Sequence, residues 1–284
     1  MGTGDQTIDA AGGTGELHHV EIDKVSGTLT ISDHIEISGD FTHTSGVVDA
    51  SGSTVEFQGY NATISSGDVE FANVIFDNSG NTTIDGELTV SGDLTIERLG
   101  NLNGDNVLVH GNVTTTDTSV GGTATIELVG TGDQTIDAAG GTGELHHVEI
   151  DKVSGTLMIS DHIEISGDFT HTSGVVDASG STVEFQGYNA TISSGDVEFA
   201  NVIFDNSGNT TIDGELTVSG DLTIERLGNL NGDNVLVHGN VTTTDTSVVA
   251  RPRSNWWARA TRRSTQPVVP ANCTTSRLTR CRAR

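Results

Sequence analysis

The sequence predicts an all-β protein, a parallel β-solenoid of about twelve short coils. Three observations carry this prediction. Runs of three to five residues alternate apolar and polar side chains, which is the pattern of short strands with one buried face. Clusters of Gly, Asn, Asp and Ser separate these runs about every six to ten residues, and such residues favour turns. No segment keeps a helical apolar period, so helices are not expected.

The clearest strand candidates are residues 28–31, 34–37, 87–90 and 93–96. Side chains on a strand alternate between its two faces, so each run buries every second residue. The Thr, Glu, His and Asp residues between them take the outer face. The predicted inward-facing residues are Leu29, Ile31, Ile35, Ile37, Leu88, Val90, Leu94 and Ile96.

A long repeat organises the chain. Residues 2–120 recur as residues 130–248, and the copies differ only at Thr30 and Met158. This near identity indicates a recent duplication or an assembly artefact, and it places any site of the first copy in the chain twice. Six coils of about 21 residues account for the offset, and twelve coils at about 4.8 Å each give a rod of about 60 Å. The expected units are residues 1–129, residues 130–248 and a different segment at residues 249–284.

Two tandem β-sandwich domains of about 120 residues are the alternative fold. The solenoid is favoured because the predicted strands are very short and a weaker internal repeat relates residues 17–46 to residues 71–100. Aromatic residues are also scarce, whereas a sandwich of this size usually contains longer strands and a buried Trp or Tyr.

Charge is divided sharply along the chain. The 39 acidic and 13 basic residues give a net charge of −26, but nine of the basic residues, all Arg, lie in residues 249–284. The first 248 residues, with 39 acidic and four basic side chains, therefore carry −35 and repel nucleic-acid phosphates and anionic lipid. They contain no Cys, which excludes a disulfide framework. No run of about 18 apolar residues occurs, so membrane insertion is not expected.

Both ends of the chain depart from the repeat. The second copy stops abruptly at Val248, and the Arg-rich segment that follows contains both Cys residues. A nucleic-acid or membrane tail, a cationic anchor and an out-of-frame translation are the three interpretations. The last is favoured and predicts a disordered tail. The first copy starts at Gly2, inside a structural unit and without a signal peptide, so we expect a fragment of a longer parent chain.

Residues 54–96 resemble repeats of large extracellular surface proteins of bacteria and archaea. The matching residues are Val55, Phe57, Gly59, Thr63, Ile64, Phe71, Asn73, Phe76, Asn78, Ser79, Gly80, Gly86, Leu88, Val90, Gly92, Asp93 and Leu94. The resemblance implies a right-handed parallel β-helix of the adhesin or autotransporter-passenger type. It implies an extracellular or cell-surface location and a structural or adhesive role. The expected partners are surface carbohydrate, a cell-surface protein and neighbouring repeats of the parent chain.

An enzyme is not expected, although β-helix folds also occur in polysaccharide lyases and glycoside hydrolases. Lyase chemistry usually uses a Lys or Arg, and each copy offers one of each, namely Lys24 and Arg98 with their counterparts Lys152 and Arg226. No nucleophile elbow, phosphate-binding loop or zinc-protease motif occurs. A polysaccharide-active enzyme therefore remains the alternative function.

The most site-like string is residues 18–23, repeated at residues 146–151. With Val20 and Ile22 facing inward, one imidazole and two carboxylates line the outer face at spacings of about 6.5–7 Å. Such ligands bind zinc or calcium. The alternative is a solvated strand face, because the internal repeat has no matching ligand set. The predicted metal ligands are His19, Glu21 and Asp23, with His147, Glu149 and Asp151 in the second copy.

Two further surfaces carry weaker expectations, and no resident cofactor is predicted. Acidic and amide side chains stacked along the turns could bind calcium, although ordinary turn chemistry also explains them. The turn residues are Asp40, Asp77, Asn78, Asp93, Asn103, Asp105 and Asn106. Paired threonines at Thr28/Thr30, Thr42/Thr44 and Thr123/Thr125 are a lesser, ice-binding alternative.

Overall fold

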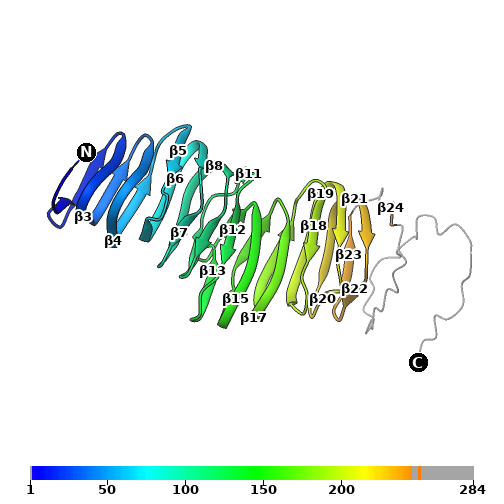
Figure 1. Cartoon of the computed structure of the whole chain (residues 1–284). Coiled ribbons are helices and arrows are strands. Elements are labelled where there is room, and N and C mark those ends of the chain that lie inside the picture. Colours follow the sequence, from blue (N-terminus) through cyan, green and yellow to red (C-terminus); the bar gives the residue numbers. More distant parts are fainter. Residues whose placement is uncertain (1, 245–248, 251–284) are drawn as a thin grey trace, which may run out of the picture.

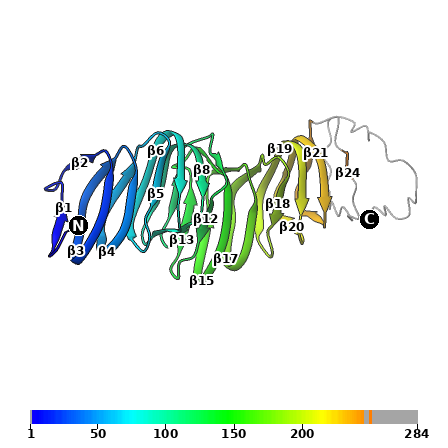
Figure 2. The same ribbon diagram turned by 45° about the horizontal axis from the view of Figure 1, so that its top comes forward.

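A computed structural model describes residues 2–244 and 249–250 and confirms the predicted fold class. Within these residues the chain has strands and turns but no helix. About twelve turns stack into one elongated rod, in which strand follows strand from one end to the other (Figures 1 and 2). The strand pairings are parallel, so the two-sandwich alternative was wrong. The predictions for residues 251–284 lie outside the described residues.

Twenty-four strands make up the described rod. Those before the second copy are β1 (Gln6–Ile8), β2 (Thr14–Leu17), β3 (Val20–Ile37), β4 (Phe41–Phe57), β5 (Ala62–Ser65), β6 (Glu70–Ile84), β7 (Leu88–Val90), β8 (Leu94–Gly104), β9 (Val107–Val109), β10 (Val113–Thr115), β11 (Gly121–Gly122) and β12 (Thr125–Leu128). The others are β13 (Gln134–Asp137), β14 (Thr142–Leu145), β15 (His147–Ile159), β16 (His162–Ile165), β17 (Phe169–Phe185), β18 (Ala190–Ser193), β19 (Glu198–Ile212), β20 (Leu216–Val218), β21 (Leu222–Gly232), β22 (Val235–Val237), β23 (Val241–Thr243) and β24 (Val249–Ala250).

Several strands are much longer than the predicted runs. Strand β3 has 18 residues because backbone pairing with β4 continues around two corners of the coil. The register shifts at these corners, between Asp23 and Thr28 and between Thr30 and Ser32. Such bulges let a strand bend without losing its ladder. The short alternating runs are therefore the flat segments between bends.

Each turn contributes three flat segments, so three ladders run along the rod. Ladder 1 contains Leu29, ladder 2 contains Ile35, and ladder 3 contains Ile22. Partners in a ladder lie 19 to 23 residues apart, as in Leu29–Val48 and Gln6–Leu29, which agrees with the predicted coil of about 21. Ladder 1 runs through residues 6–8, 28–31, 47–50, 70–71, 88–90, 107–109, 126–128, 147–150 and 169–171. Ladder 2 runs through residues 14–17, 34–37, 54–57, 73–76, 94–96, 113–115, 134–136 and 157–159. Ladder 3 runs through residues 20–23, 41–43, 62–65, 82–84, 101–104 and 121–122, and then through residues 142–145, 162–165 and 182–185.

The core occupies the interior of the stacked coils. All eight residues predicted to face inward are buried there. Although aromatic residues are few, every Phe is buried, and four stack in each copy. The rings of Phe41 and Phe71 meet edge to face with centroids 5.3 Å apart, and the ring of Phe57 lies 6.1 Å from that of Phe71. Edge-to-face pairs add roughly 0.5–1.5 kcal/mol beyond area burial, so aromatic stacks strengthen a thin core.

The repeat does not correspond to a whole number of turns. Counted along the chain, 19 flat segments separate Val20 from Val148, which is six turns plus one segment. Val20 therefore lies on ladder 3 and Val148 lies on ladder 1. Ile35 lies on ladder 2, whereas its counterpart Ile163 lies on ladder 3. The prediction of six coils was correct to within this one segment.

Candidate functional site

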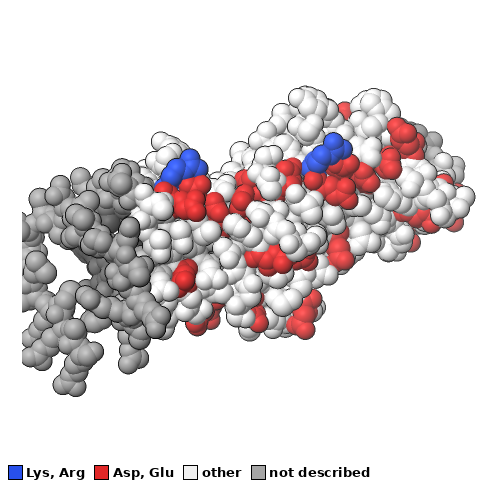
Figure 3. All heavy atoms as spheres, turned by 180° about the vertical axis from the view of Figure 1, so that it is seen from behind, with Lys and Arg blue, Asp and Glu red and all other residues white. Residues whose placement is uncertain are grey.

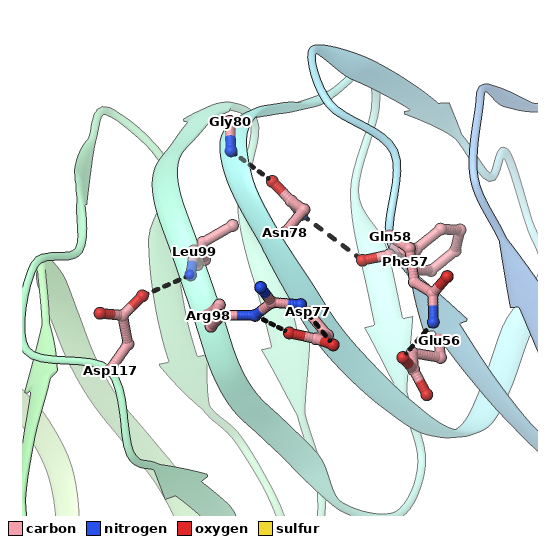
Figure 4. A network of polar contacts seen from close by, with 9 residues as sticks. All are labelled: Glu56, Phe57, Gln58, Asp77, Asn78, Gly80, Arg98, Leu99 and Asp117. Carbon is pink, nitrogen blue, oxygen red and sulfur yellow. Dashed lines mark hydrogen bonds and ion pairs between the residues drawn. The ribbon is translucent and has the colours of Figure 1, made fainter.

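The outer surface of the rod is strongly anionic. Figure 3 shows acidic side chains over much of one face and two small basic patches among them. Both lysines of the described residues, Lys24 and Lys152, are buried. Arg98 is exposed but pairs with Asp77 of the preceding coil, and its Nη2 lies 2.9 Å from a carboxylate oxygen (Figure 4). The surface therefore favours cations and neutral ligands over anions.

Of the predicted ligands, Glu21 and Asp23 lie on the outer face of β3, and His19 directly precedes this strand. Val20 and Ile22 face inward as expected. His19 Nδ1 accepts a hydrogen bond of 2.8 Å from the backbone N–H of Asp40 on the next coil. Asp23 accepts one of 2.7 Å from the hydroxyl of Ser45. The possible metal-ligand atoms of His19 and Asp23 therefore point to separate hydrogen-bond partners along the strand.

The second copy repeats this arrangement. His147 Nδ1 accepts from the backbone N–H of Asp168 at 2.9 Å, and Asp151 accepts from the hydroxyl of Ser173 at 2.6 Å. Glu149 accepts from the hydroxyl of Thr172 at 3.2 Å. Neither set belongs to a cluster of close metal-ligand atoms within the described residues. Metal binding at these six positions stays a prediction.

A different group of potential ligands does converge. His34 and Glu36 lie two residues apart on the outer face of β3, and Glu56 of β4 is the register partner of Glu36 on the next coil. One ligand atom from each side chain lies within 4.8 Å of the others. His162, Glu164 and Glu184 form the same cluster between β16 and β17. Glu16, another member of the same register, continues the row of carboxylates beyond Glu36.

Neighbouring side chains fix one carboxylate of this cluster. Glu56 Oε2 lies 2.9 Å from His34 Nε2, and Glu56 Oε1 accepts a hydrogen bond of 2.6 Å from Gln58 Nε2. Figure 4 shows the amide of Gln58 turned toward Glu56 beside the strand. In the second copy the corresponding distances are 3.1 Å for His162–Glu184 and 2.9 Å for Gln186–Glu184. The side chain of Glu56 is 12% exposed, so it is held in one orientation with little access to water.

Carboxylates stacked on successive coils repel one another. Glu144, Glu164 and Glu184 are register neighbours on ladder 3. Desolvation raises the pKa of Glu164, and the nearby charge of Glu184 raises that pKa further. Desolvation also raises the pKa of Glu144. Like charges placed directly opposite each other destabilise parallel or antiparallel pairs, so this row favours a bound cation or a proton.

The turn residues bond mainly to adjacent coils. Asp40 accepts from the backbone N–H of Thr63, and Asp93 accepts from the backbone N–H and side-chain amide of Asn112. Asp105 accepts from the backbone N–H of Gly86. These bonds satisfy corner N–H groups that the ladders leave free. They account for the Asp residues as turn residues, and calcium binding there stays a prediction.

The paired threonines do not stack on one another. Thr28 faces Val47 and Thr30 faces Asp49 on the next coil, whereas Thr42 lies between Glu21 and Ser65. A flat threonine array therefore does not form at these positions, which leaves no structural support for the ice-binding alternative there.

An asparagine ladder was not recognised in the sequence. The side-chain amide of Asn81 donates to Asn61 Oδ1 at 3.0 Å, and that of Asn101 donates to Asn81 Oδ1 at 2.7 Å. Next to it, the ring of Tyr60 is 72% exposed and lies against Gly80, where any side chain would collide with it. The sequence signal for this ladder is the spacing of the three Asn residues by 20 positions, which is the length of one coil.

A hollow of about 560 Å³ opens at the first coil, where Val20, Ile22 and Leu29 line it beside Lys24. In the second copy the preceding coil packs on the corresponding residues. Gln134, for example, donates to the backbone oxygen of Val109 at 3.0 Å. The hollow is therefore the stacking surface of a coil.

Comparisons with protein-family models, curated proteins and solved structures gave no significant match. The described part of the chain contains no helix that is long and apolar enough to cross a membrane.

Proposed function

We propose that this chain is a structural repeat segment of a large secreted or cell-surface protein, in which it acts as a rigid spacer and presents a binding face. The observation that carries the proposal is the continuity of ladder 2 across the junction of the two copies. Leu94 pairs with Val113, and Ile136 pairs with both Val113 and Ile159. Because the backbone hydrogen bonds continue through the junction, each added coil lengthens one rod, which is the property that a spacer needs.

Neutral carbohydrate is the ligand class that we propose for the binding face. The exposed ring of Tyr60 lies flat on the next coil and offers an apolar surface to a sugar ring. The amides of Asn61, Asn81 and Asn101 beside it can donate to and accept from hydroxyl groups. The acidic surface disfavours anionic polymers. The same arrangement occurs at Tyr188 with Asn189, Asn209 and Asn229.

The spacer is tested by small-angle X-ray scattering of the full chain. A rod of about twelve coils gives a length of about 60 Å for the ordered part. A compact particle with the radius of gyration of a globular protein of this mass would contradict the proposal.

The binding face is tested by retention on immobilised neutral and acidic polysaccharides. We expect retention on a neutral polymer, and its loss in a variant with Tyr60→Ala and Tyr188→Ala. Val47→Ala with Val175→Ala, which removes other exposed apolar groups, is the matched control. If both variants were still retained on the neutral polymer, this would contradict the proposal that the Tyr and Asn face binds carbohydrate. Shortening of the polymers on incubation would instead favour the polysaccharide-active alternative.

A further inference from the structure

We propose that His34, Glu36 and Glu56 bind a divalent transition-metal ion, with Zn²⁺ as the preferred ion, and that His162, Glu164 and Glu184 form a second, identical site. Each site links two successive coils, because Glu56 lies on β4 whereas His34 and Glu36 lie on β3.

The donor set fits the chemistry of zinc. One imidazole nitrogen and two carboxylate oxygens converge within 4.8 Å, and zinc is bound by His and carboxylate ligands at about 2.0–2.2 Å. Three protein ligands leave a fourth position for water in a tetrahedral site. Metal entry replaces the 2.9 Å hydrogen bond between His34 Nε2 and Glu56 Oε2 with two metal bonds. Both side chains are on neighbouring flat strands, so small rotamer changes suffice.

The surroundings orient the ligands. Gln58 holds the Oε1 atom of Glu56, which leaves Oε2 directed toward the imidazole. Hydrogen bonds of this kind to ligating carboxylates are a regular feature of metal sites, and their loss typically weakens metal binding 10–100-fold. The half-buried His34 and the largely buried Glu56 also limit competition from water.

The electrostatics favour a cation at this position. Glu16, Glu36 and Glu56 occupy one register on three successive coils, with no Lys or Arg among the members of that register. A divalent ion neutralises the repulsion between two of these carboxylates. Calcium and magnesium prefer six or more oxygen ligands or retained water, whereas an imidazole suits zinc, nickel and copper. The imidazole therefore selects a transition metal.

The test uses the full chain with Cys273→Ser and Cys281→Ser, because thiolates also bind zinc. Isothermal titration with Zn²⁺ at pH 7.5 is expected to show two equivalents per chain. Substitution by Co²⁺ provides a spectroscopic readout through its visible absorption. The chain carrying His34→Gln and His162→Gln is expected to lose both equivalents.

Two further variants separate a metal site from a structural pair. His19→Gln with His147→Gln changes the same number of histidines on neighbouring positions and is expected to keep both equivalents. Gln58→Leu with Gln186→Leu is expected to weaken binding at least tenfold without loss of fold, measured by circular dichroism. Absence of binding at millimolar Zn²⁺ in the folded parent would overturn the proposal. Loss of binding only in the His19→Gln, His147→Gln variant would also overturn the proposal. It would assign the metal to residues 19–23 and 147–151.

Discussion

Val20 and Val148 occupy the same position in two nearly identical copies, yet they lie on different ladders of the same rod. A repeat of 128 residues advances the chain by six turns and one flat segment, so identical side chains occupy different ladders. Paired sites therefore do not form one continuous array. His34 lies on ladder 2 and His162 lies on ladder 3, for example. Any ligand that spans both copies must tolerate this change of ladder.

The register at the junction can be tested by a disulfide. Glu127 of β12 is the register partner of Glu149 of β15, with side chains on the same outer face. Neighbouring strands lie about 4.8 Å apart, which is within the Cα range for a disulfide. In a background without Cys273 and Cys281, Glu127→Cys with Glu149→Cys is expected to cross-link under mild oxidation, as measured by thiol titration.

The control for this cross-link moves one cysteine along the strand. Glu127→Cys with Asp151→Cys places the Cα atoms about 8 Å apart, beyond disulfide reach, so it should stay reduced. If the two copies stacked after a whole number of turns, residue 149 would not lie beside residue 127. A reduced Glu127→Cys, Glu149→Cys protein would therefore contradict the register.

The aromatic stack is expected to dominate the stability of each copy. Phe71→Ala removes a fully buried ring that contacts Phe41 and Phe57, and such truncations cost about 3–5 kcal/mol. The unfolding midpoint in urea should fall clearly, and Phe199→Ala should behave in the same way. Tyr60→Ala is the control, because its ring is 72% exposed and its loss should change stability by at most about 0.5 kcal/mol. Equal effects of Phe71→Ala and Tyr60→Ala on stability would contradict the burial of the Phe71 ring in the core.

Much of the fold could be predicted because the alternation of apolar residues directly encodes which face of a strand is buried. Leu29, Ile35 and Leu94 were placed in the core on this basis, and each is buried. The change of ladder between copies could not be predicted in the same way. It depends on bends such as that at residues 23–28, where hydrogen bonding continues through a register shift. A count of residues does not reveal how many bends a coil contains.

The candidate site was harder to predict because it is formed between coils. His19, Glu21 and Asp23 are close in the sequence, and their alternation alone suggested a shared face. The cluster at His34 needs Glu56, a residue of the next coil, and the match requires the register between β3 and β4. Adding the coil length of 20 residues to Glu36 would have pointed to Glu56. The asparagine ladder from Asn61 to Asn101 had the same signal.

The asparagine ladder is expected to contribute modestly to stability. Asn81→Ala removes the donor to Asn61 and the acceptor for Asn101 at the middle of the ladder. Each hydrogen bond is worth about 0.5–1.5 kcal/mol, and the lower end applies at an exposed corner, so we expect a loss of about 1 kcal/mol in total. Thermal unfolding of the variant measures this loss. Thr83→Ala, at another exposed position of β6, should have a smaller effect, and a reversed order would contradict the ladder.

The stacked carboxylates predict a pH-dependent effect of Glu164→Gln. Desolvation, together with the charge of Glu184, raises the pKa of Glu164 in the folded state above its usual value near 4.5. At pH 7 the raised pKa means that burial penalises the ionised form in the folded state, which opposes folding. As the pH falls through the folded pKa toward 4.5, the folded state binds a proton that the unfolded state does not, so the parent gains stability. Below 4.5 both states are protonated and the gain is complete.

Glu164→Gln removes this ionisation, so with EDTA present its melting temperature should exceed that of the parent at pH 7. We expect a difference of about 1–2 °C, since solvent screening at a half-buried group limits the effect to about 0.5 kcal/mol. The difference should shrink toward zero as the pH approaches 4.5. Comparing variant with parent at each pH cancels the other groups, including His146, whose pKa is lowered by desolvation and which opposes the trend. A constant difference in melting temperature between the Glu164→Gln variant and the parent across this range would mean that repulsion within the row of carboxylates does not destabilise the folded state. It would also remove one reason for a cation to bind there.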